Sequence, residues 1–133
     1  MHVQEDDNME IKSLNQKYTS QIGIVYVYST FNNTLITITN IKGKTLVFAS
    51  AGFLGLKGVR RSTAYAGQTL ATMLGKKISE LGIQFVQIRL KGFGNARKSV
   101  IKGFTSTNLE IISIKDFTPI AHNGCRRKKK RRI

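Results

Sequence analysis

The chain has 133 residues, 41% of them hydrophobic, and carries 22 Lys and Arg against 7 Asp and Glu, a formal net charge of +15. This length is enough for one domain with a core, and too short for two. The charge predicts a polyanion-binding protein, with nucleic acid as the first ligand class and an anionic membrane surface as the second. Composition alone does not separate RNA from DNA.

Several other classes of protein are excluded by local features. The longest apolar runs are only as long as a strand, so no bilayer-spanning segment is expected. The first residues lack the pattern of a secretory signal and that of an Arg-rich import presequence, so neither is expected. The single cysteine, Cys125, cannot form an intramolecular disulfide, which favours a reducing compartment or indifference to redox state.

Strand patterns dominate the first third of the chain. Residues 1–20 are polar and aperiodic and hold four of the seven acids, so we expect a flexible acidic arm there. In residues 22–28, both the odd-numbered and the even-numbered positions are rich in β-branched and aromatic residues. This pattern indicates a strand covered on both faces. Two further strands are predicted over 34–40 and 45–50, and the short turns between them predict an antiparallel meander.

A basic loop and a helix come next. Residues 51–61 interleave glycines with Lys and Arg, and Ser62 or Thr63 is placed to cap the helix that follows. Gly67 and Gly75 weaken this helix, which indicates that it packs closely on the sheet. The apolar positions that recur at helical spacing are Ala66, Leu70, Met73, Leu74, Ile78 and Leu81.

The remaining elements complete the fold. A strand is predicted over 83–90, a basic helix over 97–107 and a final strand over 109–115. The order βββαβαβ predicts an α/β fold, a three-layer-like sandwich in which right-handed crossovers extend the meander into a mixed sheet. We expect this α/β domain to span 21–116 and 117–133 to form a basic extension.

The C-terminal run of seven basic residues, from Arg126 to Arg132, is the strongest single signal. The like charges of such a run repel one another in the free protein. We therefore expect the run to be disordered until it binds phosphate groups. A solvated tail or a localisation signal is the alternative interpretation.

Two loops lead from a strand into a helix, where backbone amides and the helix dipole favour anions. In the second loop, Gly92-Phe93-Gly94 resembles the opening of a dinucleotide fingerprint, but Arg97 stands where its third glycine belongs. We therefore expect polynucleotide phosphate rather than a nucleotide cofactor at these loops. A purely structural turn remains an alternative for the glycines.

Enzymatic functions find little support. Outside the first ten residues the carboxylates are Glu80, Glu110 and Asp116, too few and too scattered for a two-metal nuclease site. His2 is the only other His or Cys besides His122 and Cys125, so zinc would lack a fourth ligand of its usual kind. A catalytic dyad of His122 and Cys125 would lack a scaffold. No catalytic residue, metal or cofactor is expected, although a nucleic-acid-processing enzyme and a DNA-binding architectural protein remain alternatives.

Five motifs resemble the S11 family of small-subunit ribosomal proteins over about residues 21–133. The most specific is D-x-T-P-x-x-H-N-G-C-R, which runs from Asp116 to Arg126 into the basic end. The other four are Phe31-Asn32-Asn33-Thr34, Ser50-Ala51-Gly52, Gly58 with Arg60-Arg61-Ser62-Thr63, and Lys91-Gly92-Phe93-Gly94.

The resemblance implies a non-catalytic protein of the small-subunit platform that binds small-subunit rRNA near the messenger exit and the rRNA 3′ end. Neighbouring platform proteins and nearby messenger RNA are the implied partners, without a membrane or a homo-oligomer. With the basic residues beside the motifs, the candidate rRNA-binding residues are Asn32, Asn33, Thr34, Lys57, Arg60, Arg61, Ser62, Lys91, Gly92, Gly94, Arg97, Lys98, Lys102, His122, Asn123, Gly124, Arg126, Arg127, Lys128, Lys129, Lys130, Arg131 and Arg132.

The sequence also departs from the family pattern. Phe93 stands where the family has proline and Ala96 where it has glycine, and the N-terminal arm is acidic rather than basic. Ile, Lys and Asn make up 37 of the 133 residues, a bias that AT-rich coding produces. We therefore expect an organelle-encoded ribosomal protein, mitochondrial before plastid, with a bacterial cytoplasm as the alternative.

Overall fold

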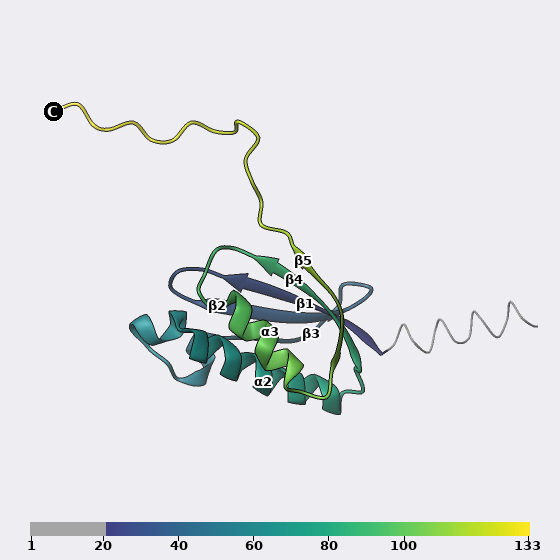
Figure 1. Cartoon of the computed structure of the whole chain (residues 1–133). Helices are drawn as coiled ribbons and strands as arrows, with labels where there is room; N and C mark the ends of the chain where they lie inside the picture. Colours follow the sequence, from purple (N-terminus) through teal and green to yellow (C-terminus); the bar gives the residue numbers. More distant parts are fainter. Residues whose placement is uncertain (1–20) are drawn as a thin grey trace, which may run out of the picture.

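Strands and helices follow one another in the predicted order in the computed structural model, which describes residues 21–133 (Figure 1). The predicted acidic arm, 1–20, lies outside the described residues. Predicted and observed ends of the helices and strands agree within two residues, the usual uncertainty at such ends. The elements are β1 (Ile22–Ser29), β2 (Thr34–Asn40), β3 (Thr45–Ser50), the 3₁₀ segments η1 (Ala51–Leu54) and η2 (Gly58–Ser62), α2 (Ala64–Glu80), β4 (Phe85–Lys91), α3 (Arg97–Thr105) and β5 (Glu110–Asp116).

The five strands form one mixed sheet in the order β3-β2-β1-β4-β5. β2 pairs antiparallel with both β1 and β3, whereas β4 pairs parallel with both β1 and β5. This topology confirms the predicted meander extended by βαβ crossovers. It also means that β1, β3, β4 and β5 all end at the same edge of the sheet, which we call the carboxyl edge.

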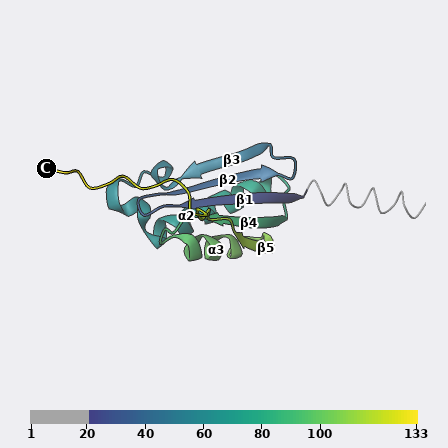
Figure 2. The same cartoon turned by 90° about the horizontal axis from the view of Figure 1, so that it is seen from above.

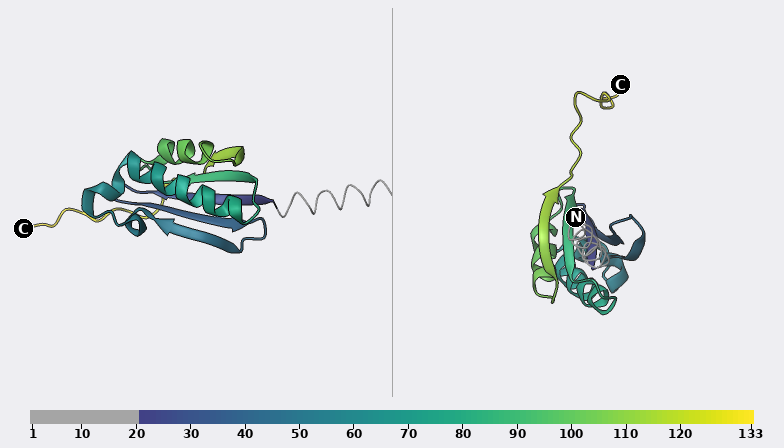
Figure 3. Two further views of the ribbon diagram at one scale, coloured as in Figure 1. Left: turned by 90° about the horizontal axis from the view of Figure 1, so that it is seen from below. Right: turned by 90° about the vertical axis from the view of Figure 1, so that its right-hand side faces the viewer.

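Both helices cover the same face of the sheet, so the described domain has two layers rather than the expected three (Figures 2 and 3). Val25 and Val27 point into the core, while Tyr26 and Tyr28, which alternate with them along the strand, are 39% and 42% exposed on the opposite face. The expectation that β1 is covered on both faces was therefore wrong. We call the uncovered side the open face.

The core lies between the sheet and the helices. Fully buried side chains from β1, β2, β4, α2 and α3 meet there, among them Val25, Ile36, Leu70, Ile88 and Phe104. Burial of each such side chain contributes about 1.5–3 kcal/mol. No helix within residues 21–133 is both long and apolar enough to cross a membrane.

The two helices approach each other closely because glycines line their contact. A Cβ on Gly67 of α2 would lie 2.7 Å from the Cβ of Ala96, and a Cβ on Gly103 of α3 would lie 2.7 Å from the Cβ of Ala71. The glycines of α2 thus pack against α3 and the turn after it, not against the sheet as the sequence analysis expected. This contact fixes the start of α3 beside the carboxyl edge.

Candidate nucleic-acid interface

Four predicted segments that are far apart in sequence meet at the carboxyl edge. They are the turn 30–33 after β1, the loop 51–62 after β3, the loop 91–97 after β4, and the start of the C-terminal extension after β5 (Figure 1). The topology causes this convergence, because the four strands that precede these segments all end there.

The hairpin turn is held by Thr30 and Asn33. The Thr30 hydroxyl donates to the Asn33 carbonyl oxygen at 3.0 Å, and the Asn33 side-chain oxygen accepts from the Thr34 amide at 2.9 Å. Thr34 itself is fully buried, so its side chain does not reach the surface of this turn. Asn32 is the predicted residue of this turn whose side chain is exposed at the tip.

The first basic loop folds into two short 3₁₀ segments before α2. Lys57 and Arg60 are exposed, and Arg61 is half-buried with its Nε donating to the Gly58 carbonyl oxygen at 3.4 Å. The Ser62 hydroxyl donates to the Val59 carbonyl oxygen at 2.8 Å, so it shapes the loop. Of the two predicted caps, Thr63 is the one used, and its hydroxyl accepts from the Ala66 amide at 3.2 Å.

The second basic loop is pressed against the end of β1. Gly92 has a φ of +92°, and the Gly94 amide donates to the Ser29 carbonyl oxygen at 3.0 Å. A Cβ on Gly92 would overlap that oxygen, and one on Gly94 would overlap the Ser29 hydroxyl. Packing therefore accounts for both glycines without a ligand, the structural alternative that the sequence left open.

A hollow of about 520 Å³ lies beside this loop, and Phe93, Asn95, Arg97 and Lys98 are among the residues that line it. Lys91 and Lys98 are exposed, and Lys102 is exposed one turn beyond Lys98 on the same side of α3. Phe93, which replaces the family's proline, is 65% exposed at the tip of the loop. The altered loop thus keeps its cations at the surface.

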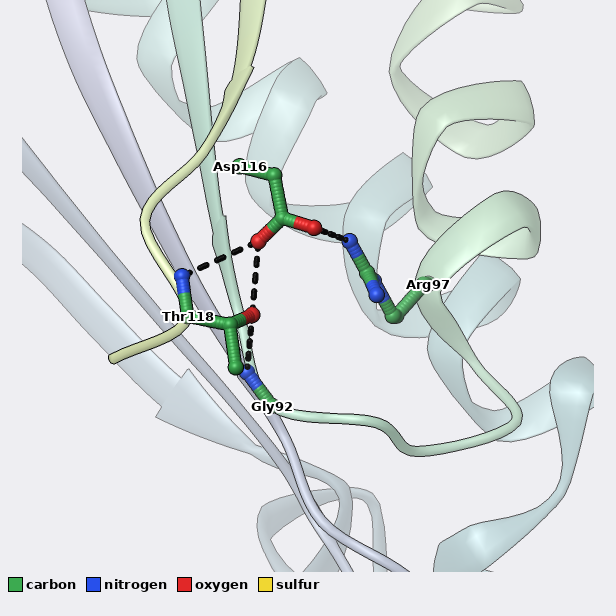
Figure 4. Close-up of polar contacts among 4 residues, drawn as sticks. All are labelled: Gly92, Arg97, Asp116 and Thr118. Carbon is green, nitrogen blue, oxygen red and sulfur yellow. Dashed lines mark hydrogen bonds and ion pairs between the residues drawn. The ribbon is translucent and has the colours of Figure 1, made fainter. Parts of the chain in front are cut away.

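Asp116 joins the second loop, α3 and the C-terminal extension (Figure 4). Its Oδ2 accepts from Arg97 Nη2 at 2.6 Å, and its Oδ1 accepts from the Thr118 amide at 3.0 Å and the Thr118 hydroxyl at 2.6 Å. The Thr118 hydroxyl in turn accepts from the Gly92 amide at 3.2 Å. We call these four residues the Asp116 network.

These contacts lower the pKa of Asp116 from its ordinary 3.8 to about 2. The Thr118 hydroxyl contributes most, followed by the Thr118 amide and the Arg97 guanidinium, because each stabilises the ionised carboxylate. Arg97 was predicted as an rRNA-binding cation, and the structure shows it paired with this carboxylate. The sequence analysis missed Asp116 and Thr118 as structural residues, although Asp-x-Thr is a spacing at which an Asp side chain bonds the backbone two residues on.

Charge is distributed unevenly between the two edges of the sheet. Within residues 21–133, Glu80 ends α2 and Glu110 begins β5, so both lie at the edge opposite the carboxyl edge. Asp116, the described acid at the carboxyl edge, is paired with Arg97. The C-terminal extension adds seven exposed basic side chains, with His122 and Cys125 also exposed. No three His, Cys, Asp or Glu side chains in the described part of the chain are grouped to hold a metal.

An α/β domain with a cationic edge and a cationic extension defines a polyanion-binding protein. The profile of the family described as Ribosomal protein S11 matches residues 23–132, and the chain belongs to this family. The family is structural and non-enzymatic, as the scarcity of carboxylates predicted.

Relatives support the same assignment along most of the chain. The chain is similar to small ribosomal subunit protein uS11 of Endomicrobium trichonymphae, 44% identical over 91% of this chain and 92% of the relative. It is 47% identical to the uS11 of Rhodopirellula baltica over 84% of this chain and 87% of the relative. It is also 49% identical to small ribosomal subunit protein uS11m of Prototheca wickerhamii over 84% and 87%.

Proposed function

We propose that this protein is a structural constituent of the small ribosomal subunit and binds small-subunit rRNA through its carboxyl edge and C-terminal extension. The observation that carries this proposal is the convergence of exposed cations from two loops and the extension on one edge. Phosphate contacts of this kind supply affinity and position without reading sequence.

Finer details of the role follow from the family pattern. The protein sits on the platform of the subunit, near the messenger exit and the rRNA 3′ end, and contacts neighbouring platform proteins. It orders its extension only as rRNA folds around it. The matching motifs at 31–34, 91–94 and 116–126 support this placement.

The rRNA-binding residues of this proposal lie in four segments that present side chains at the surface: the hairpin turn, the two basic loops, the second with the start of α3, and the C-terminal extension. Ser62, Gly92, Gly94 and Arg97 support the loops from which these side chains project. The contacting residues are Asn32, Lys57, Arg60, Arg61, Lys91, Lys98, Lys102, His122, Asn123, Gly124 and the basic run 126–132.

We further propose a mitochondrial ribosome as its location. The Ile, Lys and Asn bias and the similarity to the relative named uS11m support this proposal, and a plastid or a bacterial cytoplasm is the alternative. Sucrose-gradient fractionation of purified organelles, with and without a high-salt wash, tests it. Salt-resistant migration with the organellar small subunit is expected, and migration with cytosolic ribosomes or DNA would contradict it.

Replacement of Arg60 and Arg61 by Ala tests the rRNA-binding edge. Loss of two phosphate contacts should lower the slope of log K against log salt by about 1 to 2. The matched control is Lys42→Ala with Lys44→Ala, which removes the same charge from the exposed β2–β3 turn at the opposite edge. Equal slopes for the two double variants would refute the assignment, and preference for duplex DNA at equal salt would favour the architectural alternative.

A further inference from the structure

Aromatic and cationic side chains form two cross-strand pairs on the open face. In the β1–β4 register, Tyr26 lies opposite Arg89 and Tyr28 lies opposite Lys91. The Arg89 Cζ is 5.5 Å from the centre of the Tyr26 ring, and the Lys91 Nζ is 5.3 Å from the centre of the Tyr28 ring. Phe117 adds a second ring on Arg89, at 5.1 Å.

These side chains border a hollow of about 350 Å³, which Pro119 also lines. Phe117 is 52% exposed, and the two tyrosines are exposed as well. Arg89 Nη1 donates to the Tyr26 hydroxyl at 3.2 Å, but its Nε is buried and has no acceptor within residues 21–133. A buried donor without a partner is costly, so an acceptor beside Arg89 would stabilise this arrangement.

Packing in the core does not explain these rings, because both helices cover the other face of the sheet. The charge of the hollow also argues against an apolar peptide as its ligand: Arg89 and Lys91 line it, and no acidic side chain of residues 21–133 does. Aromatic rings and guanidinium planes can stack on the bases of unpaired RNA, and nearby amines can bind its phosphates. The two pairs lie about 7 Å apart along the strands, a separation suited to neighbouring nucleotides of an extended strand.

We propose that the open face around Tyr26, Tyr28, Arg89 and Phe117 binds unpaired nucleotides of RNA by stacking. This inference rests on the proposed function and adds to it a second kind of contact, with bases rather than phosphates. The face is continuous with the carboxyl edge. Lys91 begins the second loop, Phe117 begins the extension, and both line the hollow. A single strand leaving a bound helix therefore passes directly onto the open face.

The test compares two probes on the purified full chain: a single-stranded uridine oligomer and a blunt RNA duplex of the same length. The readout is the ratio of the two dissociation constants by fluorescence anisotropy, because phosphate contacts of the basic extension act on both probes. Tyr28→Leu should weaken single-strand binding by about 5- to 100-fold while duplex binding stays constant. Tyr28→Phe keeps the ring and should keep the ratio.

Phe48→Leu is the matched control. Phe48 is 77% exposed, and the strand register places it beside Thr37 on the same face as Tyr26. Within residues 21–133 no cation lies over its ring. If Tyr28→Leu does not fold, as judged by circular dichroism, Tyr26→Leu on the other pair carries the same expectation. An unchanged ratio, or an equal loss in Phe48→Leu, would overturn the proposal. Reduced incorporation into reconstituted subunits at an unchanged ratio would assign the face to a protein instead and overturn it as well.

Failure of this inference is distinguishable from failure of the proposed function. If the Arg60 and Arg61 variant lowers the salt slope while Tyr28→Leu changes nothing, rRNA binding stands and only the stacking surface is refuted. If the full chain binds neither probe, the proposed function itself fails.

Discussion

Arg97 and Asp116 join the first residue of α3 to the last residue of β5 through a 2.6 Å ion pair. The pair does not stand alone, because Thr118 occupies the second oxygen of the carboxylate and also accepts from the Gly92 amide. One carboxylate thus connects a helix start, a glycine loop and the base of the C-terminal extension.

This carboxylate should make stability depend on pH in a defined range. Because the pKa of Asp116 is lowered from 3.8 to about 2 in the folded protein, its contribution is complete above pH 3.8 and is lost as the pH falls through about 2. Urea unfolding of the wild type and of Asp116→Asn over this range should show the difference in free energy shrinking with acid. Both proteins keep all the other carboxylates, so the contributions of those groups cancel in the difference. A difference in the free energy of unfolding that stays constant with pH would contradict the assignment.

Gly92→Ala should be strongly destabilising. Its φ of +92° and the overlap of a Cβ with the Ser29 carbonyl oxygen act together, so we expect a loss of about 3 kcal/mol or more in the free energy of unfolding. Gly43→Ala is the control, since Gly43 has a φ of +90° but no neighbour within 4 Å. That variant should lose only about 1–2 kcal/mol, and equal losses would show that the contact with Ser29 is unimportant.

Phe104 is the largest fully buried side chain of α3 and should report on the core. Phe104→Ala removes its packing and leaves a cavity, so a loss of about 3–5 kcal/mol is expected in chemical denaturation. Phe53→Ala, at a side chain that is 72% exposed, should stay within about 0.5 kcal/mol of the wild type. Similar losses at both positions would be inconsistent with the described core.

Replacement of the seven basic residues of 126–132 by Gln keeps the length of the extension and removes its charge. If all seven neutralise phosphates, the salt dependence of RNA binding should fall by about 5 to 6 in slope. The domain should unfold at the same urea concentration, because these side chains are exposed and lie outside the core. An unchanged slope would show that the extension does not contact RNA.

Much of the fold could be predicted from the sequence because the spacing of apolar residues differs clearly between its strands and its helices. The strand around Val25 was placed correctly, but its second face was not, since a tyrosine favours strands equally well when buried or half-exposed. Gly67 was correctly read as a close contact and assigned to the wrong partner, because sequence does not reveal which element approaches.

The candidate site was predicted in part, for a similar reason. Basic side chains in strand-to-helix loops such as Lys57 and Lys98 are visible in the sequence and lie on the surface. The pairing of Arg97 with Asp116 is a contact between residues 19 apart, which depends on the β4-α3-β5 crossover returning β5 to the carboxyl edge. The burial of Thr34 depends likewise on packing that the turn motif does not encode.

The Asp116 network has a consequence for how the extension finds its ligand. It fixes the point from which the chain departs, so the seven cations search only a small volume around the carboxyl edge. If the two loops bind rRNA as proposed, capture of the next phosphates by the extension is an intramolecular step. Its effective concentration is on the order of millimolar, as for a short flexible linker. Contacts that are weak one by one then give a long residence time on RNA. Removal of the Asp116 carboxylate should shorten that residence time.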